Sequence, residues 1–82
     1  MPYIYRPSRA RLALEVKQLP ETAGELNYCI TQLCQRYLER EGDSYTVRNE
    51  IIGALECAKL EFYRRAVVPF ECRKILENGD IY

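Results

Sequence analysis

The chain has 82 residues, enough for one domain but near the size at which a single core contributes only ~3–5 kcal/mol of stability. Hydrophobic residues make up 48% of it, which excludes a disordered tail. Lys and Arg number 12, as do Asp and Glu, so no net positive charge directs the chain toward nucleic acid or an anionic membrane. No apolar run approaches the ~20 residues of a membrane span, and the first residues contain no apolar signal segment. We therefore expect one domain, residues 1–82, in the cytoplasm.

The N-terminal residues 1–7 are predicted to form an extended arm, because Pro2 and Pro7 bracket them. Ser8 is a suitable N-cap for a short helix that continues to Leu19. Positive charge gathers around this arm and helix, opposed locally by Glu15. The basic residues are Arg6, Arg9, Arg11 and Lys17.

Pro20 marks the boundary before a second helix. Thr22 and Glu25 have the spacing of a capping box, and Gly42 is suited to a left-handed C-cap, so this helix is predicted to run to about Glu41. Its apolar positions recur at helical spacing: Leu26, Cys29, Ile30, Leu33, Cys34, Tyr37 and Leu38.

The longest helical pattern runs from Ser44 to Val68, with Asp43 or Ser44 as its N-cap, and the tight turn before it predicts an antiparallel helical hairpin. One face is expected to pack on the core: Val47, Ile51, Ala54, Leu55, Ala58, Phe62 and Ala66. The opposite face is also apolar, so we predict a homo-oligomer assembled through the long helix. The predicted interface residues are Ile52, Gly53, Cys57, Leu60 and Val67.

Pro69 is expected to kink or break the long helix, with residues 69–78 continuing as a last short helix. Asn78 and Gly79 end that helix, which leaves residues 79–82 as an extended tail. The predicted fold class is all-α: a helical hairpin with short flanking helices at both ends.

The chain has four cysteines and no histidine. Cys29, Cys34, Cys57 and Cys72 contain no Cys-x-x-Cys pair, so buried, reduced thiols are expected, with a disulfide, a metal site or a reactive thiol as the other interpretations. Histidine is the commonest general base and metal ligand, and no pair of acids has metal-binding or acid–base spacing. We therefore expect no metal, no cofactor and no enzymatic activity.

Two segments, GELNYCITQL at residues 24–33 and IIGALECAKLEFYRRAVVPFECRKILENGDIY at residues 51–82, resemble a family of small uncharacterised proteins of tailed phages and prophages. The opening MPYI is also similar. The resemblance implies a phage accessory gene, and with it a small oligomeric binder or an inhibitor of a host system. It brings no catalytic residues.

The second face of the long helix is the first candidate site. Asn49, Glu56 and Tyr63 lie beside its apolar residues, and two interpretations are open. They can form the polar rim of a homodimer interface. Alternatively they line a pocket between subunits, where Asn49 and Glu56 hydrogen-bond a ligand and Tyr63 stacks on it.

Two further clusters could bind an anion. In the arm, Tyr3 and Tyr5 lie next to Arg6 and Arg9, a combination that stacks on bases and binds phosphates. The other interpretation is an arm across a neighbouring subunit, with its arginines solvated or paired. Near the end of the long helix, Arg64 and Arg65 form either a solvated turn paired with Glu61 or an anion site. The anion site would be shared with Lys59 or with Arg73 and Lys74.

The leading functional prediction is a non-enzymatic protein that binds a small anionic, nucleotide-like ligand at subunit interfaces. In a phage setting, this would sequester a cyclic nucleotide or another nucleotide-derived immune signal of the host. The alternative is a protein-interaction or scaffold module that holds a host or phage protein. A helix-turn-helix regulator is the third interpretation, and the long helix argues against it because it presents apolar residues where base-reading side chains belong.

Overall fold

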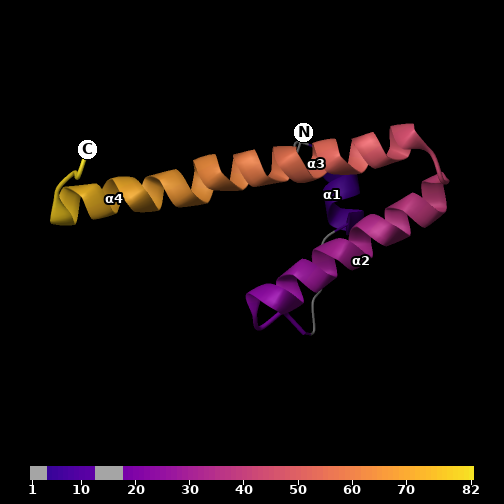
Figure 1. Cartoon of the computed structure of the whole chain (residues 1–82), viewed down its shortest axis with the longest axis horizontal. Coiled ribbons are helices and arrows are strands. Elements are labelled where there is room, and N and C mark those ends of the chain that lie inside the picture. Colours follow the sequence, from indigo (N-terminus) through magenta and orange to yellow (C-terminus); the bar gives the residue numbers. More distant parts are fainter. Residues whose placement is uncertain (1–3, 13–17) are drawn as a thin grey trace.

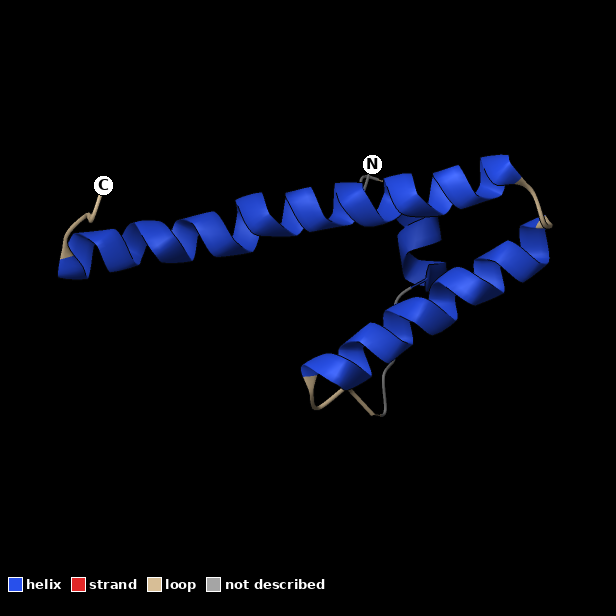
Figure 2. Cartoon of the chain, viewed as in Figure 1, coloured by secondary structure: helices blue, strands red, loops and turns tan. Residues whose placement is uncertain are grey.

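The structure is a computed structural model that describes residues 4–12 and 18–82. Within these residues, every regular element is a helix, which confirms the all-α prediction (Figure 2). The elements are α1 (Arg6–Leu12), α2 (Ala23–Glu41), α3 (Tyr45–Phe62), the π-helical segment η1 (Tyr63–Val67) and α4 (Val68–Asn78). No helix in the described part of the chain is both long and apolar enough to cross a membrane.

Helix α1 begins earlier than predicted, at Arg6 rather than after Ser8. Pro7 is tolerated because the first turn of a helix needs no backbone donor. The extended arm of the prediction therefore does not include Arg6 and Pro7, and Tyr3 lies outside the described residues. The predicted continuation to Leu19 crosses residues 13–17, which also lie outside them.

Helix α2 begins and ends where the sequence predicts. The Glu25 amide donates to Thr22 Oγ1 at 3.1 Å, which confirms Thr22 as the N-cap. The Glu25 carboxylate accepts from the Glu21 amide at 2.9 Å, one residue before the donor of a standard capping box. At the other end, Gly42 has φ 107° and ψ 159°, a conformation outside the left-handed helical region and open essentially to glycine.

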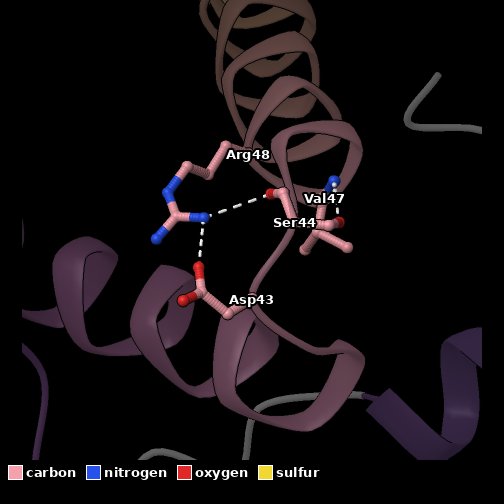
Figure 3. Close-up of polar contacts among 4 residues, drawn as sticks. All are labelled: Asp43, Ser44, Val47 and Arg48. Atoms are coloured by element: carbon pink, nitrogen blue, oxygen red, sulfur yellow. Dashed lines mark hydrogen bonds and ion pairs between the residues drawn. The ribbon is translucent and has the colours of Figure 1, made fainter.

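Helix α3 begins at a cap built from three consecutive interactions (Figure 3). The Val47 amide donates to Ser44 Oγ at 3.1 Å, so Ser44 is the N-cap. Arg48 Nη1 lies 2.5 Å from Asp43 Oδ1 and donates to the Ser44 carbonyl at 3.2 Å. The side chain of Arg48 thereby ties the turn to the first turn of the helix, and Asp43 serves as an ion-pair partner and not as the cap.

The helical rod continues through Pro69 without a break, because the preceding five residues adopt π-helical hydrogen bonding. The Val68 amide donates to the Tyr63 carbonyl, five residues earlier. A proline lacks an amide donor, and its ring opposes the carbonyl four residues before it, so the wider turn relieves a clash that an α-helix would suffer. Helix α4 then carries Pro69 in its first turn and ends at Gly79 (φ 85°), as the sequence predicts.

The helices form an open V (Figure 1). The rod of α3, η1 and α4 is one side of the V and α2 is the other, and the two sides diverge from the turn at Gly42. The radius of gyration is 16.6 Å, whereas a globular domain of this length has about 12 Å. The described part of α1 makes no close backbone contact with α2, α3 or α4.

The predicted core is largely absent from the single chain. Among the described residues only Val47, which is 8% exposed, is buried. Farther along the same face, Leu55 is 38% exposed and Phe62 is 66% exposed, because α2 has diverged from α3 before it reaches them. The periodicity that predicted a core face is real, but one chain does not cover it.

Candidate functional site

The candidate site with the most predicted residues is one side of α3, which we call the outer stripe: Asn49, Ile52, Gly53, Glu56, Leu60 and Tyr63. These residues recur every three or four positions, so they share one side of the helix, opposite Val47. All six are exposed, including Ile52 (65%) and Leu60 (58%). The structure therefore brings the polar and apolar candidates together on one accessible surface, with Cys57 and Lys59 along its edges.

The extra residue in η1 alters where this surface continues. A π-helical turn displaces every later position by one relative to an uninterrupted α-helix. Val68 consequently takes the place on the outer stripe that an α-helix would give to Val67. Val67 is half-buried, and Val68 is 38% exposed.

The charged candidates on α3 and η1 are paired within the chain. Lys59 Nζ lies 3.4 Å from Glu56 Oε1, and both side chains are more than half exposed. Arg64 pairs with Glu61, and Arg65 Nε lies 3.9 Å from the other oxygen of the same carboxylate. The exposed pair of Lys59 and Glu56 contributes at most ~1 kcal/mol. The interpretation of Arg64 and Arg65 as a salt-bridged turn therefore holds for the single chain.

Among the arm candidates in the described residues, Tyr5 precedes α1, whereas Arg6 and Arg9 belong to α1. Tyr5 and Arg6 are exposed, and Arg9 is turned back on the chain. Arg9 Nε donates to the Ile4 carbonyl at 2.9 Å, and the Arg9 amide donates to the Tyr5 carbonyl at 3.1 Å. Tyr5 is 77% exposed, and among the described residues Arg6 has no acidic partner. The arm candidates thus lie together, apart from the outer stripe in the single chain, since α1 does not pack on α3.

A polar contact that the sequence reasoning missed joins α2 to α3. Tyr37 Oη donates to Glu50 Oε2 at 3.1 Å. This hydrogen bond, followed by the negative charge of Glu50, raises the pKa of the Tyr37 hydroxyl above its ordinary value of 10.0. The signal in the sequence was a tyrosine on the apolar stripe of α2, whose hydroxyl needs a partner when its ring packs.

Neither an anion site nor a metal centre is found elsewhere in the described residues. A shallow, open depression of about 660 Å³ at the start of α2 is lined by Leu19, Tyr28 and the carboxylates of Glu21 and Glu25. Its acidic lining does not suit an anion. Within residues 4–12 and 18–82, no three Cys, Asp or Glu side chains gather as metal ligands.

The four cysteines are free, but the prediction that they are buried is wrong. Cys29, Cys57 and Cys72 are exposed and Cys34 is half-buried. The face of α2 that was expected to bury Cys29 has no element packed over most of its length. Burial was predicted from the apolar pattern on the assumption that another part of the chain would pack over it.

The fold and the site define an all-helical protein whose amphipathic helices are capped and ordered but leave most of their apolar surface uncovered. The chain belongs to the family described as Domain of unknown function (DUF6899), whose profile matches residues 1–81. No curated protein and no solved structure matched the chain.

Proposed function

We propose that the protein is a non-enzymatic binding protein that works as a homo-oligomer and holds a small anionic, nucleotide-like ligand between its subunits. The observation that carries the proposal is the outer stripe, where hydrogen-bonding side chains alternate with exposed apolar ones on the same side of one helix. A surface of this composition, once another subunit covers its apolar part, leaves polar groups directed into an enclosed space.

The arm supplies the positive charge that the outer stripe lacks. Lys59 and Arg64 are already paired with carboxylates, so an anion needs cations from elsewhere. Arg6 is exposed beside Tyr5, and a guanidinium next to an aromatic ring suits a nucleotide. We propose that the arm of one subunit meets the outer stripe of another. In a phage-infected cell such a protein would sequester a nucleotide-derived host signal in the cytoplasm.

The test is native mass spectrometry of the freshly purified, reduced protein, followed by calorimetric titration with 3′,5′-cyclic AMP, cyclic di-AMP and cyclic GMP–AMP. We expect at least one probe to bind, and Tyr63→Ala and Arg6→Ala each to weaken that binding at least ~5-fold, since a stacking or charge-assisted contact contributes ~1–3 kcal/mol. Arg36→Ala is the matched control, because Arg36 is an exposed arginine on α2 away from both clusters. Failure of all three probes to bind, with no nucleotide-sized mass on the purified protein, contradicts the ligand proposal.

A second candidate function, a scaffold that holds a host or phage protein, is favoured by the exposed apolar side chains of α4. Leu76 is 86% exposed, and Phe70 is 50% exposed beneath the cations of Arg73 and Lys74. These residues lie beyond the outer stripe. A Leu76→Ala variant that keeps nucleotide binding but loses a co-purifying polypeptide would assign the two functions to different surfaces.

A further inference from the structure

We infer that a second copy of this chain fills the V between α2 and α3, so that two open chains interdigitate into a four-helix core. The inference concerns the inner faces of the V, not the outer stripe, and it does not depend on the proposed ligand. The inner faces consist of one line of residues on α2 and one on α3. They are Leu26, Ile30, Leu33 and Tyr37 on α2, and Val47, Ile51, Leu55 and Phe62 on α3.

Contacts near the turn establish which faces line the V. Tyr37 donates a hydrogen bond to Glu50, so this side of α2 is directed at α3. Val47, the residue buried near the turn, marks the side of α3 that is directed at α2. By helical spacing, the remaining inner residues lie on the same sides of α2 and α3. These sides face the opening where the two helices diverge (Figure 1).

Exposure rises along the inner face of α3 with distance from the turn, from 8% at Val47 to 38% at Leu55 and 66% at Phe62. On α2 all four inner residues are exposed without a trend: Tyr37 42%, Leu33 69%, Ile30 40% and Leu26 51%. The apolar pattern thus extends well beyond the part of each face that the chain itself covers.

The uncovered area matches what an obligate dimer buries. The chain exposes 7924 Å², whereas a folded monomer of 9.7 kDa exposes about 5,100 Å². The excess is about 2,800 Å² per chain and hence about 5,600 Å² for two chains, which is at the upper end of permanent homodimers, in which the two subunits together bury ~2,000–5,000 Å² or more.

Charge and symmetry favour a second copy as the occupant. The inner faces beyond the turn present aliphatic and aromatic side chains, and the chain carries 12 positive and 12 negative residues, so two copies approach without net repulsion. In a two-fold arrangement each α2 enters the V of the other chain. The apolar inner faces of the two chains then bury each other, and the result is the usual packing of a four-helix bundle.

The experiment is size-exclusion chromatography with light scattering on the reduced full-length protein, with three variants. We expect the parent to be a dimer or a multiple of one, and Leu33→Glu and Phe62→Glu to raise the dissociation constant at least ~30-fold, since a central interface residue contributes ~2 kcal/mol or more. Leu76→Glu, which adds the same charge at an exposed leucine of α4, is the matched control and should leave the dimer intact.

A measurement on the parent protein covers the case in which the inner-face variants fail to fold. In an equal mixture of isotope-labelled and unlabelled chains, intermolecular nuclear Overhauser effects should connect the Leu33 and Ile30 methyl groups with the Phe62 ring. A monomer with a radius of gyration near 12 Å would mean that the V closes on itself, and a monomer near 16.6 Å would leave the faces for another protein. Either monomer, or intermolecular contacts confined to Ile52 and Leu60, overturns the inference.

Discussion

Single side chains make the polar contacts at the turn between α2 and α3. Ser44 caps α3 and Arg48 ties Asp43 to that cap (Figure 3). Tyr37 of α2 donates a hydrogen bond to Glu50 of α3. The Tyr37 and Arg48 hydrogen bonds are exposed and the Ser44 cap is part-buried, and each is individually modest. Substitutions of Ser44 and of Tyr37 test these contacts directly.

Replacement of the cap should destabilise α3. Ser44→Ala removes the acceptor of the Val47 amide and is expected to lower the free energy of unfolding by about 1 kcal/mol, equivalent to about 4–8 °C in Tm. Thermal denaturation at a fixed protein concentration measures the change. Thr46→Ala, in the first turn of the same helix, is the control and should change stability by only a few tenths of a kcal/mol. Equal losses in both variants would contradict the cap assignment.

The hydrogen bond of Tyr37 makes part of the stability depend on alkaline pH. Because the folded-state pKa of Tyr37 is raised above 10.0, its contribution is fully present below pH 10.0 and is lost as the pH rises through the folded-state value. Tyr37→Phe should remove the pH-dependent stabilisation by the Tyr37 hydroxyl. The free energy of unfolding should then fall less between neutral and alkaline pH in the variant than in the parent protein. Denaturant titrations on both sides of pH 10.0 measure it, with Tyr28→Phe as the control. An unchanged alkaline slope in Tyr37→Phe would contradict the assignment.

At the scale of elements, the π-helical segment decides how α4 is presented. It lets one rod pass through Pro69, and it displaces the faces of α4 by one position relative to α3. The outer stripe therefore continues through Val68, and the phase of the apolar pattern changes in the middle of the rod. From the sequence, Pro69 was expected to kink or break the helix, and the π-helical turn that accommodates it was not predicted.

Removal of the proline should return the segment to an α-helix. Pro69→Ala restores a backbone donor and removes the ring, so amide hydrogen exchange at residues 64–69 should slow and helical circular dichroism should increase. The stabilisation should not exceed ~3 kcal/mol, the cost of a proline inside an unrelieved helix. Pro20→Ala, in the link before α2, is the control. Unchanged exchange at residues 64–69 would mean that another residue causes the π-helical turn.

At the scale of the molecule, the described part of the chain is a set of helices, of which α2 and α3 have side-chain N-caps, with almost no core of its own. With one buried residue among those described, the single chain has too little apolar burial to offset the conformational entropy of its ordered backbone. The two-chain core inferred above would supply the missing burial, and in that case we expect stability to depend on protein concentration.

A concentration series tests this dependence without any variant. For a dimer, each tenfold increase in protein should stabilise the folded state by about 1.4 kcal/mol per mole of dimer, and Tm should rise steadily. Differential scanning calorimetry across a hundredfold range of concentration measures the slope. A Tm that does not vary with concentration would show that the single chain folds by itself, contrary to the area argument.

The sequence by itself determined the parts that short-range chemistry controls. Thr22 and Ser44 begin helices because a side-chain oxygen meets an amide three residues on, and Gly42 and Gly79 end them because their positive φ suits glycine. The pairs of Glu61 with Arg64 and Arg65 follow from helical spacing in the same way. These signals lie within about one helical turn, so they can be read without knowledge of the fold.

Only the tertiary structure decided the divergence of α2 from α3, the Tyr37–Glu50 contact and the exposure of the predicted core. An apolar stripe indicates which face needs cover, but the partner that covers it is set by how helices pack over long distances. The sequence reasoning assigned the face of Leu55 and Phe62 to the chain's own core. The open V leaves it uncovered, because a short connection fixes where two helices meet and not the angle at which they separate.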